Sequence, residues 1–193
     1  MSSSGPGSTR SIWALIAMLW LGLFVTGIWI DGQASFPLWR LSVPTLLWLG
    51  GLLVPLRFPT DGWRIATAWL VHVDALHVLS NLTLLGWLGW LWPIRWSPRA
   101  PLLLGICSSG AATIFLSPRH ELVSAGGSGV LLTLFATAAV GVVSRSVRAR
   151  ALFACAAVLS SGIWFSVDWA AHAGGLLAGL AWGFFQRRQT TTA

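Results

Sequence analysis

Six long apolar runs constrain the fold of this chain more than any other feature. They cover residues 12–30, 66–93, 101–117, 125–144, 151–165 and 169–186. A helix of about 20 apolar residues crosses the ~30 Å hydrocarbon core of a bilayer, and within lipid only helices and closed barrels satisfy every backbone polar group. With 55% hydrophobic and 9% charged residues, the composition agrees. The runs therefore predict an all-α, polytopic membrane protein with six transmembrane helices.

The apolar segment between the first two runs is shorter and interrupted. Leu41–Leu56 contains Pro44, Pro55 and the Gly50-Gly51 pair, and it falls below the roughly 20 residues that a spanning helix needs. We expect this segment to lie in or on the membrane interface, within the first outer loop. A seven-span arrangement, in which it crosses the membrane, stays open on charge alone.

The arginines predict how the chain is oriented. The chain has twelve arginines and no lysine, and with the N-terminus inside, eight fall on the inner side and four on the outer side, as the positive-inside rule requires. The inner set is Arg10, Arg95, Arg99, Arg145, Arg148, Arg150, Arg187 and Arg188, and the outer set is Arg40, Arg57, Arg64 and Arg119. This scatter excludes a nucleic-acid-binding face, on which basic residues gather.

The ends of the chain are polar, and the sequence contains no recognisable metal site. We expect a short disordered tail at 1–10, a six-helix membrane domain at 11–187 and a short tail at 188–193. Cys107 and Cys155 each lie inside an apolar run, where a thiol packs as a small hydrophobe. His120-Glu121 lacks the second histidine of a zinc-protease motif. Neither a metal nor another cofactor is therefore expected.

Polar side chains inside the runs are candidates for function, because ionisable groups within a bilayer are costly. In the expected orientation, four of them fall in the outer half of their spans although they are far apart in sequence. A proton-relay transporter is disfavoured, because these residues have no acidic partner deep in the spans. The polar residues of the runs are His72, Asp74, His77, Asn81, Ser128 and His172, and the four at one depth are His72, His77, Ser128 and His172.

Ser128 and His172 form the most specific pair among these residues. Ser128 lies in a Gly-Gly-Ser-Gly stretch that, unlike a flexible linker, runs directly into an apolar segment. His172, Gly175 and Gly179 share one helical stripe, where glycines let another helix approach closely. If that helix begins at Ser128, a hydroxyl lies beside a base, which is the minimum for nucleophilic catalysis. Asp168 could orient His172 as a third triad member, but we favour a helix N-cap, which leaves a Ser–His dyad.

His77 and Asn81 are four residues apart, so on one helix they can donate hydrogen bonds to a common point. His72 precedes His77 by five residues, about 140° around a helix, so these histidines do not form an i, i+4 metal pair.

Together these residues resemble the rhomboid family of intramembrane serine proteases over roughly Trp63–Gln186. The matching motifs are Trp63-Arg64, the His-x4-His-x3-Asn of His72, His77 and Asn81, the Gly-x-Ser-Gly of Gly126–Gly129, and the Ala-His-x-x-Gly-x-x-x-Gly of Ala171–Gly179.

The resemblance implies a serine endopeptidase with a six-helix fold and a membrane-associated first outer loop. It would hydrolyse peptide bonds in or near transmembrane segments of membrane-protein substrates, within the lipid bilayer of the bacterial inner membrane, with both termini cytoplasmic. Ser128 would be the nucleophile, His172 the base, and His77, Asn81 and the Ser128 backbone N–H the oxyanion donors. The supporting residues would be His72, Gly126, Gly129, Gly175 and Gly179, with Trp63 and Arg64 structuring the first loop.

The chain departs from the family at one position. Many members carry an aromatic residue one turn after the nucleophile, packed on the catalytic histidine, whereas this chain has Leu132 there and no tyrosine at all. The alternative reading is a catalytically inactive rhomboid-like protein that binds membrane clients, against which the intact Ser128 and His172 argue.

Overall fold

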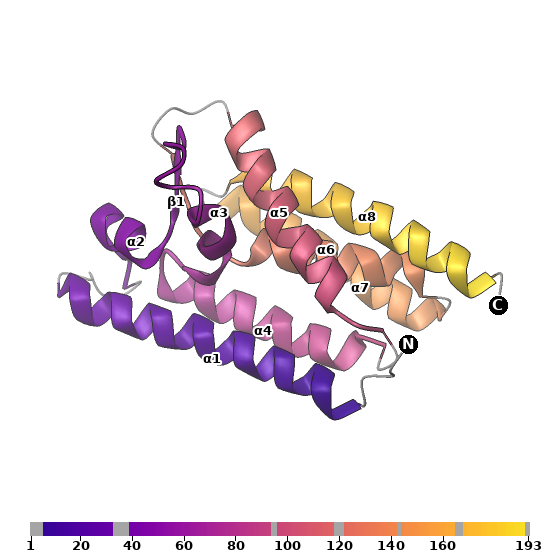
Figure 1. The fold of residues 1–193 in the computed structure, drawn as a ribbon. Coiled ribbons are helices and arrows are strands. Elements are labelled where there is room, and N and C mark those ends of the chain that lie inside the picture. The colour runs from indigo at the N-terminus through magenta and orange to yellow at the C-terminus, as the bar shows by residue number, and fades with distance from the viewer. Residues whose placement is uncertain are drawn as a thin grey trace.

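The computed structural model describes residues 6–32, 39–93, 96–117, 122–142, 144–164 and 168–191. Six long helices make up the body of the molecule, and Figure 1 shows both termini at the end opposite α2 and β1. The long helices are α1 (Pro6–Asp31), α4 (Ala75–Leu91), α5 (Arg99–Leu116), α6 (Ser128–Gly141), α7 (Arg145–Trp164) and α8 (Trp169–Thr191), and the short elements are α2 (Val43–Leu49), β1 (Leu52–Val54), α3 (Arg64–Thr67), the 3-10 helix η1 (Ala68–Leu70) and β2 (Leu122–Ser124).

The two ends of this body are named here by the residues that mark them. At the Ser128 end, α4, α6 and α8 begin and α1, α5 and α7 end; at the Arg10 end, α1, α5 and α7 begin and α4, α6 and α8 end. The helices at the chain ends extend into the segments 1–10 and 188–193 that were expected as tails. Residues 1–5 and 192–193 of those segments, and His120 and Glu121, lie outside the described residues.

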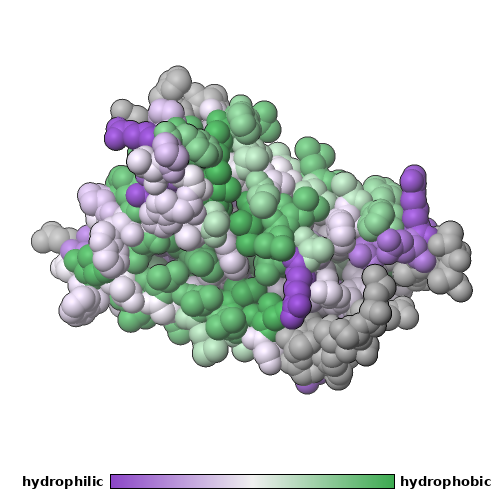
Figure 2. All heavy atoms as spheres, viewed as in Figure 1, coloured by the Kyte–Doolittle hydropathy of each residue, from purple (hydrophilic) through white to green (hydrophobic). Residues whose placement is uncertain are grey.

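Two described helices qualify as membrane spans by length and hydropathy alone, α1 and α5, and the bent pair of Arg64–Leu70 with α4 makes a third. α6 has only 14 residues, but nearly all of its side chains are buried, so other helices surround it and lipid does not. Figure 2 shows hydrophobic surface over the middle of the molecule and hydrophilic residues toward its ends. The helical architecture agrees with the all-α prediction.

Glycines on α8 bring it into backbone contact with α6. A Cβ atom added at Gly175 would collide with the carbonyl oxygen of Gly129, and one added at Gly179 would collide with that of Thr133. Gly183, one turn further, faces the Thr137 carbonyl in the same way. The stripe expected from the sequence is therefore present and one turn longer than predicted. Contacts this close are how helices associate in lipid, where apolar side chains gain nothing by leaving it.

The apolar run at 66–93 is not one helix, contrary to the prediction. Arg64–Leu70 and Ala75–Leu91 meet at 88°, and the Asp74 carboxylate accepts a hydrogen bond from the His77 backbone N–H (2.8 Å) to cap α4. His72 therefore lies in the break, and the angle of 140° expected between the two histidines does not apply. Their rings instead lie edge to face, with centroids 5.2 Å apart.

The segment Leu41–Leu56 folds into α2 and β1. Seven residues of helix rise only about 10 Å, so α2 cannot cross a ~30 Å core, and the seven-span arrangement is ruled out. Trp48 and Val43 are exposed on α2, as a position in the membrane interface requires. The pairing of β1 with β2, in antiparallel register Leu52 to Ser124, was not predicted, and it ties the first loop to the strand that leads to Ser128.

Candidate active site

Ser128 and His172 meet at the start of their helices. Ser128 is the first residue of α6, and its Oγ shares a hydrogen bond of 2.7 Å with Nε2 of His172, in the first turn of α8. The two residues are 44 positions apart in sequence, and both are buried. A hydroxyl within hydrogen-bond reach of an imidazole is the arrangement in which the imidazole can remove the hydroxyl proton during nucleophilic attack.

The helix contact beside this pair explains two of the expected supporting residues. Gly129 follows Ser128 and faces Gly175, and a Cβ added at Gly129 would lie 2.9 Å from the carbonyl oxygen of Ala171. Thr133, which the sequence analysis missed, donates from Oγ1 to the Gly175 carbonyl at 2.9 Å. The α6–α8 contact therefore holds the serine and histidine at bonding distance.

Asp168 is a helix cap, as the sequence analysis favoured. Its Oδ1 accepts a hydrogen bond from the Ala171 backbone N–H at 3.1 Å, and its Oδ2 accepts one from the Thr113 hydroxyl. Nδ1 of His172 has no hydrogen-bond partner among the described residues. The geometry is consistent with a Ser–His dyad, in which no carboxylate among the described residues bonds the second nitrogen of the histidine.

The aromatic contact to His172 comes from its own helix. Leu132 is fully buried, and the Trp169 ring lies edge to face with the His172 ring at a centroid distance of 6.0 Å. Trp169 was missed, although residues three apart share a helix face, and this spacing could have identified it.

His77 and Asn81 occupy different surroundings, although both come from α4. The ring of His77 lies against Gly126, where φ is 133° and an added Cβ would collide with the imidazole. Nε2 of His77 is buried and has no partner in the part of the chain that the structure describes. Asn81 Nδ2 instead shares a hydrogen bond with His72 Nε2 at 2.9 Å. Nε2 of His77 therefore has no partner among the described residues and lies next to Gly126, in the segment that precedes Ser128. His72 and Asn81 form a hydrogen-bonded pair beside it.

Trp20 of α1 supports this region and was also missed. Its buried ring lies 5.0 Å from the His72 ring, and a Cβ added at Gly127 would collide with it. Nothing in the pattern of fourteen tryptophans singles Trp20 out.

Trp63 and Arg64 lie in the first loop, away from the dyad. The Arg64 guanidinium donates to the Gly51 carbonyl at 3.1 Å and to the Leu47 carbonyl, pairs with Asp61, and lies over the Trp63 ring at 4.7 Å. Arg64 thus connects α2 to α3.

The described residues contain no group of three metal-binding side chains.

Comparison with known proteins places this chain in a family. A family model described as the Rhomboid domain matches residues 59–189, which is more than half of the chain and includes every site residue named above except Trp20, Leu47 and Gly51. A search of curated proteins finds no match. The match confirms the resemblance and the polytopic helical membrane fold. The chain is an integral multi-pass membrane protein and belongs to the rhomboid family.

Proposed function

We propose that this protein is an intramembrane serine endopeptidase that hydrolyses peptide bonds in or near the transmembrane segments of membrane proteins. The observation that carries the proposal is the 2.7 Å hydrogen bond between Ser128 Oγ and His172 Nε2. Membership of a family that includes serine proteases supports it. The exposed apolar surface of the bundle supports a position within the bilayer, where such substrates lie. The proposal puts the Ser128 end toward the outside and the Arg10 end toward the cytoplasm of a bacterial inner membrane, as the distribution of arginines predicts.

In this mechanism His172 acts first as base and then as acid. Nε2 accepts the Ser128 hydroxyl proton while Oγ attacks the scissile carbonyl carbon, which forms a tetrahedral oxyanion. The same proton then passes from Nε2 to the leaving amine, and the acyl-enzyme remains. Water, deprotonated by His172, hydrolyses the acyl-enzyme and regenerates the Ser128 hydroxyl.

The oxyanion would be stabilised from three sides. The Ser128 backbone N–H belongs to the first turn of α6, whose N–H groups have no partner within the helix and carry the positive end of its dipole. His77 supplies a ring N–H at the neighbouring Gly126, and Asn81 lies one turn further along α4.

A mechanism-based probe tests the proposal. A fluorophosphonate should label the purified wild-type protein, with the modified peptide mapping to Ser128, because only an activated serine attacks phosphorus readily. Ser146→Ala, which alters an exposed serine at the Arg10 end, should label as wild type, and His172→Ala should not label. A folded wild-type protein that does not react would favour the inactive, client-binding alternative.

His77→Ala is expected to lower kcat for a reporter transmembrane segment by ~10²–10³, the typical cost of losing one oxyanion donor. The Tm should fall through lost packing on His72 and Gly126, but by less than in a variant that also breaks a hydrogen bond, because Nε2 of His77 has no partner within the described residues.

Asn81→Ala provides the comparison. It should lower both kcat and Tm, since it leaves His72 Nε2 buried without its partner. Wild-type kcat in the His77→Ala protein would remove His77 from the oxyanion site.

A further inference from the structure

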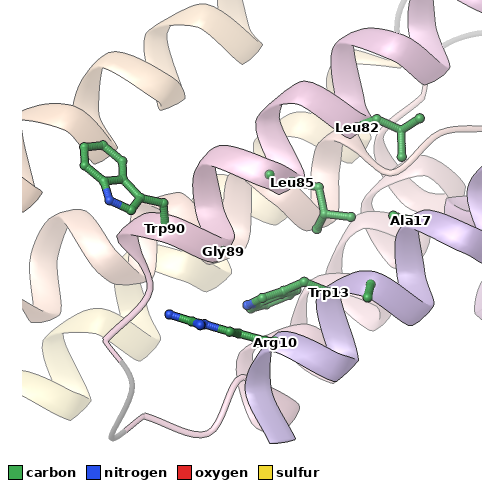
Figure 3. A pocket seen from close by; sticks show the side chains of 9 residues that line it. Arg10, Trp13, Ala17, Leu82, Leu85, Gly89 and Trp90 are labelled. Carbon is green, nitrogen blue, oxygen red and sulfur yellow. The ribbon is translucent and has the colours of Figure 1, made fainter. Parts of the chain in front are cut away.

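A second concave site lies between α1 and α4 at the Arg10 end, far along both helices from Ser128. It is a groove of about 440 Å³, within the range of small-molecule sites. Its lining includes small residues from both helices, which are Ala14, Ala17, Gly86 and Gly89 and are called the floor here. Figure 3 shows Ala17 on α1 and Gly89 on α4. A Cβ atom added at Gly86 would have nothing within 4 Å, so the space beside this helix is open.

The groove changes from polar to apolar along its length. Arg10 and Trp90 stand at its mouth, and Ala17 and Leu82 lie at its inner end. α1 begins and α4 ends at the Arg10 end, so Ala17 lies farther from that end than Arg10 does, and Leu82 lies farther from it than Trp90 does. At a rise of 1.5 Å per residue, the groove is about 10 Å long between these positions. This depth is about a third of a bilayer's hydrocarbon core. The groove thus has the polarity of one membrane leaflet, from headgroup to acyl chain.

A buried donor without a partner lies at the mouth. Trp13 is only 6% exposed, and its indole N–H has no hydrogen-bond partner among the described residues. Figure 3 shows this nitrogen and the Arg10 guanidinium at the same end of the groove. Buried polar groups are nearly always hydrogen-bonded, so this N–H is available to an acceptor that the described residues do not supply.

The charge around the mouth favours an anion. The side-chain carboxylates of the described residues belong to the Ser128 end or its loops, and they are Asp31, Asp61, Asp74 and Asp168. The only ion pair within the described residues, Arg64 with Asp61, is also at that end. A second guanidinium, that of Arg150, lies over the Trp90 ring at 4.6 Å. Within the described residues, no side-chain carboxylate forms an ion pair with Arg10 or Arg150 at this end.

We propose that this groove binds one anionic phospholipid of the surrounding leaflet. The lipid phosphate accepts hydrogen bonds from the Arg10 guanidinium and the Trp13 indole N–H, and one acyl chain lies over the small residues of the floor. A zwitterionic lipid fits less well, because its cationic headgroup would lie near the Arg10 guanidinium.

Native mass spectrometry of the purified full-length protein tests this binding without reference to proteolysis. The probes are phosphatidylglycerol and phosphatidylcholine with identical acyl chains. The wild-type protein should retain one phosphatidylglycerol in preference to phosphatidylcholine. Arg10→Gln should reduce the phosphatidylglycerol-bound fraction about fivefold, the contribution of one arginine at an anionic membrane surface. Arg99→Gln removes a charge from the same end outside the groove and should bind as wild type.

A second pair of variants tests the floor of the groove. Gly86→Leu fills the open space and should abolish retention of the lipid, whereas Gly22→Leu, at an equally open glycine of α1 outside the groove, should not. Equal retention of both lipids by the wild-type protein, or wild-type binding by Arg10→Gln, would overturn the anionic site. A protein dimer without lipid, lost in Gly86→Leu, would assign the groove to a second copy of the chain.

Discussion

Ser128→Ala is expected to leave a folded, membrane-inserted protein with no measurable proteolysis. The change removes one oxygen from the first turn of α6, where the neighbouring backbone contacts involve Gly129 and not the serine side chain. Removing the nucleophile of a serine protease lowers kcat by about 10⁶-fold, which leaves only background hydrolysis. The measurement is cleavage of a reporter transmembrane segment by purified protein in detergent, with Tm recorded on the same sample.

The control for this variant separates chemistry from packing. Loss of the hydroxyl leaves His172 Nε2 without its partner, at a cost of ~1–3 kcal/mol, so a small fall in Tm is expected. His172→Ala should give the same loss of cleavage, because serine and histidine act as a unit, and the double variant should be no worse than either single variant. Cleavage by Ser128→Ala near the wild-type rate would show that another residue is the nucleophile.

The pairing of Ser128 with His172 and the arrangement of six long helices could be predicted, because both depend on patterns that are local in sequence. Apolar runs indicate helices within the membrane domain, whether lipid or other helices surround them. The stripe of Gly175 and Gly179 indicates a close helix contact, but the partner helix can be identified only from the topology. Ser128 was the one hydroxyl bracketed by glycines at the start of an apolar run. The proximity of Ser128 to His172 then followed from placing both at the same depth.

The break between η1 and α4 could not be predicted, because its cause is a capping interaction within an apolar sequence. The Asp74 side chain bonds the His77 backbone N–H and starts a new helix, while hydropathy continues unchanged across the break. The pairing of β1 with β2 escaped prediction for a similar reason. Three-residue strands such as Leu52–Val54 have no periodicity to detect, and their partner lies far along the chain.

Part of the site comes from outside the segment that the family model matches. That match begins at residue 59, whereas Trp20 of α1 packs against His72 and closes the space beside Gly127. Trp13, which lies seven residues earlier and hence on nearly the same face of α1, belongs to the lipid groove. One face of α1 therefore serves the active site at one end and the groove at the other.

Gly175→Val is expected to insert normally yet lose most of its activity and most of its labelling by a serine probe. The Cβ of any residue at this position would collide with the Gly129 carbonyl, which is backbone and cannot rotate away. α6 and α8 must therefore separate at this contact. Gly175 lies one turn after His172 on α8, and Gly129 directly follows Ser128 on α6. A displacement of about 1 Å can cost ~10²-fold in rate, since the dyad works only at hydrogen-bond distance.

The size of the substituent and its position on the helix provide the controls. Because the first added carbon already collides, Gly175→Ala should lose most of the activity as well, and Gly175→Val should lose more. Ala173→Val adds two methyl groups to the same helix at an exposed position and should cleave and label as wild type. Its insertion and Tm give the baseline for a valine on α8. Wild-type cleavage by Gly175→Val would mean that the contact between α6 and α8 does not hold Ser128 against His172, and the histidine would need another role.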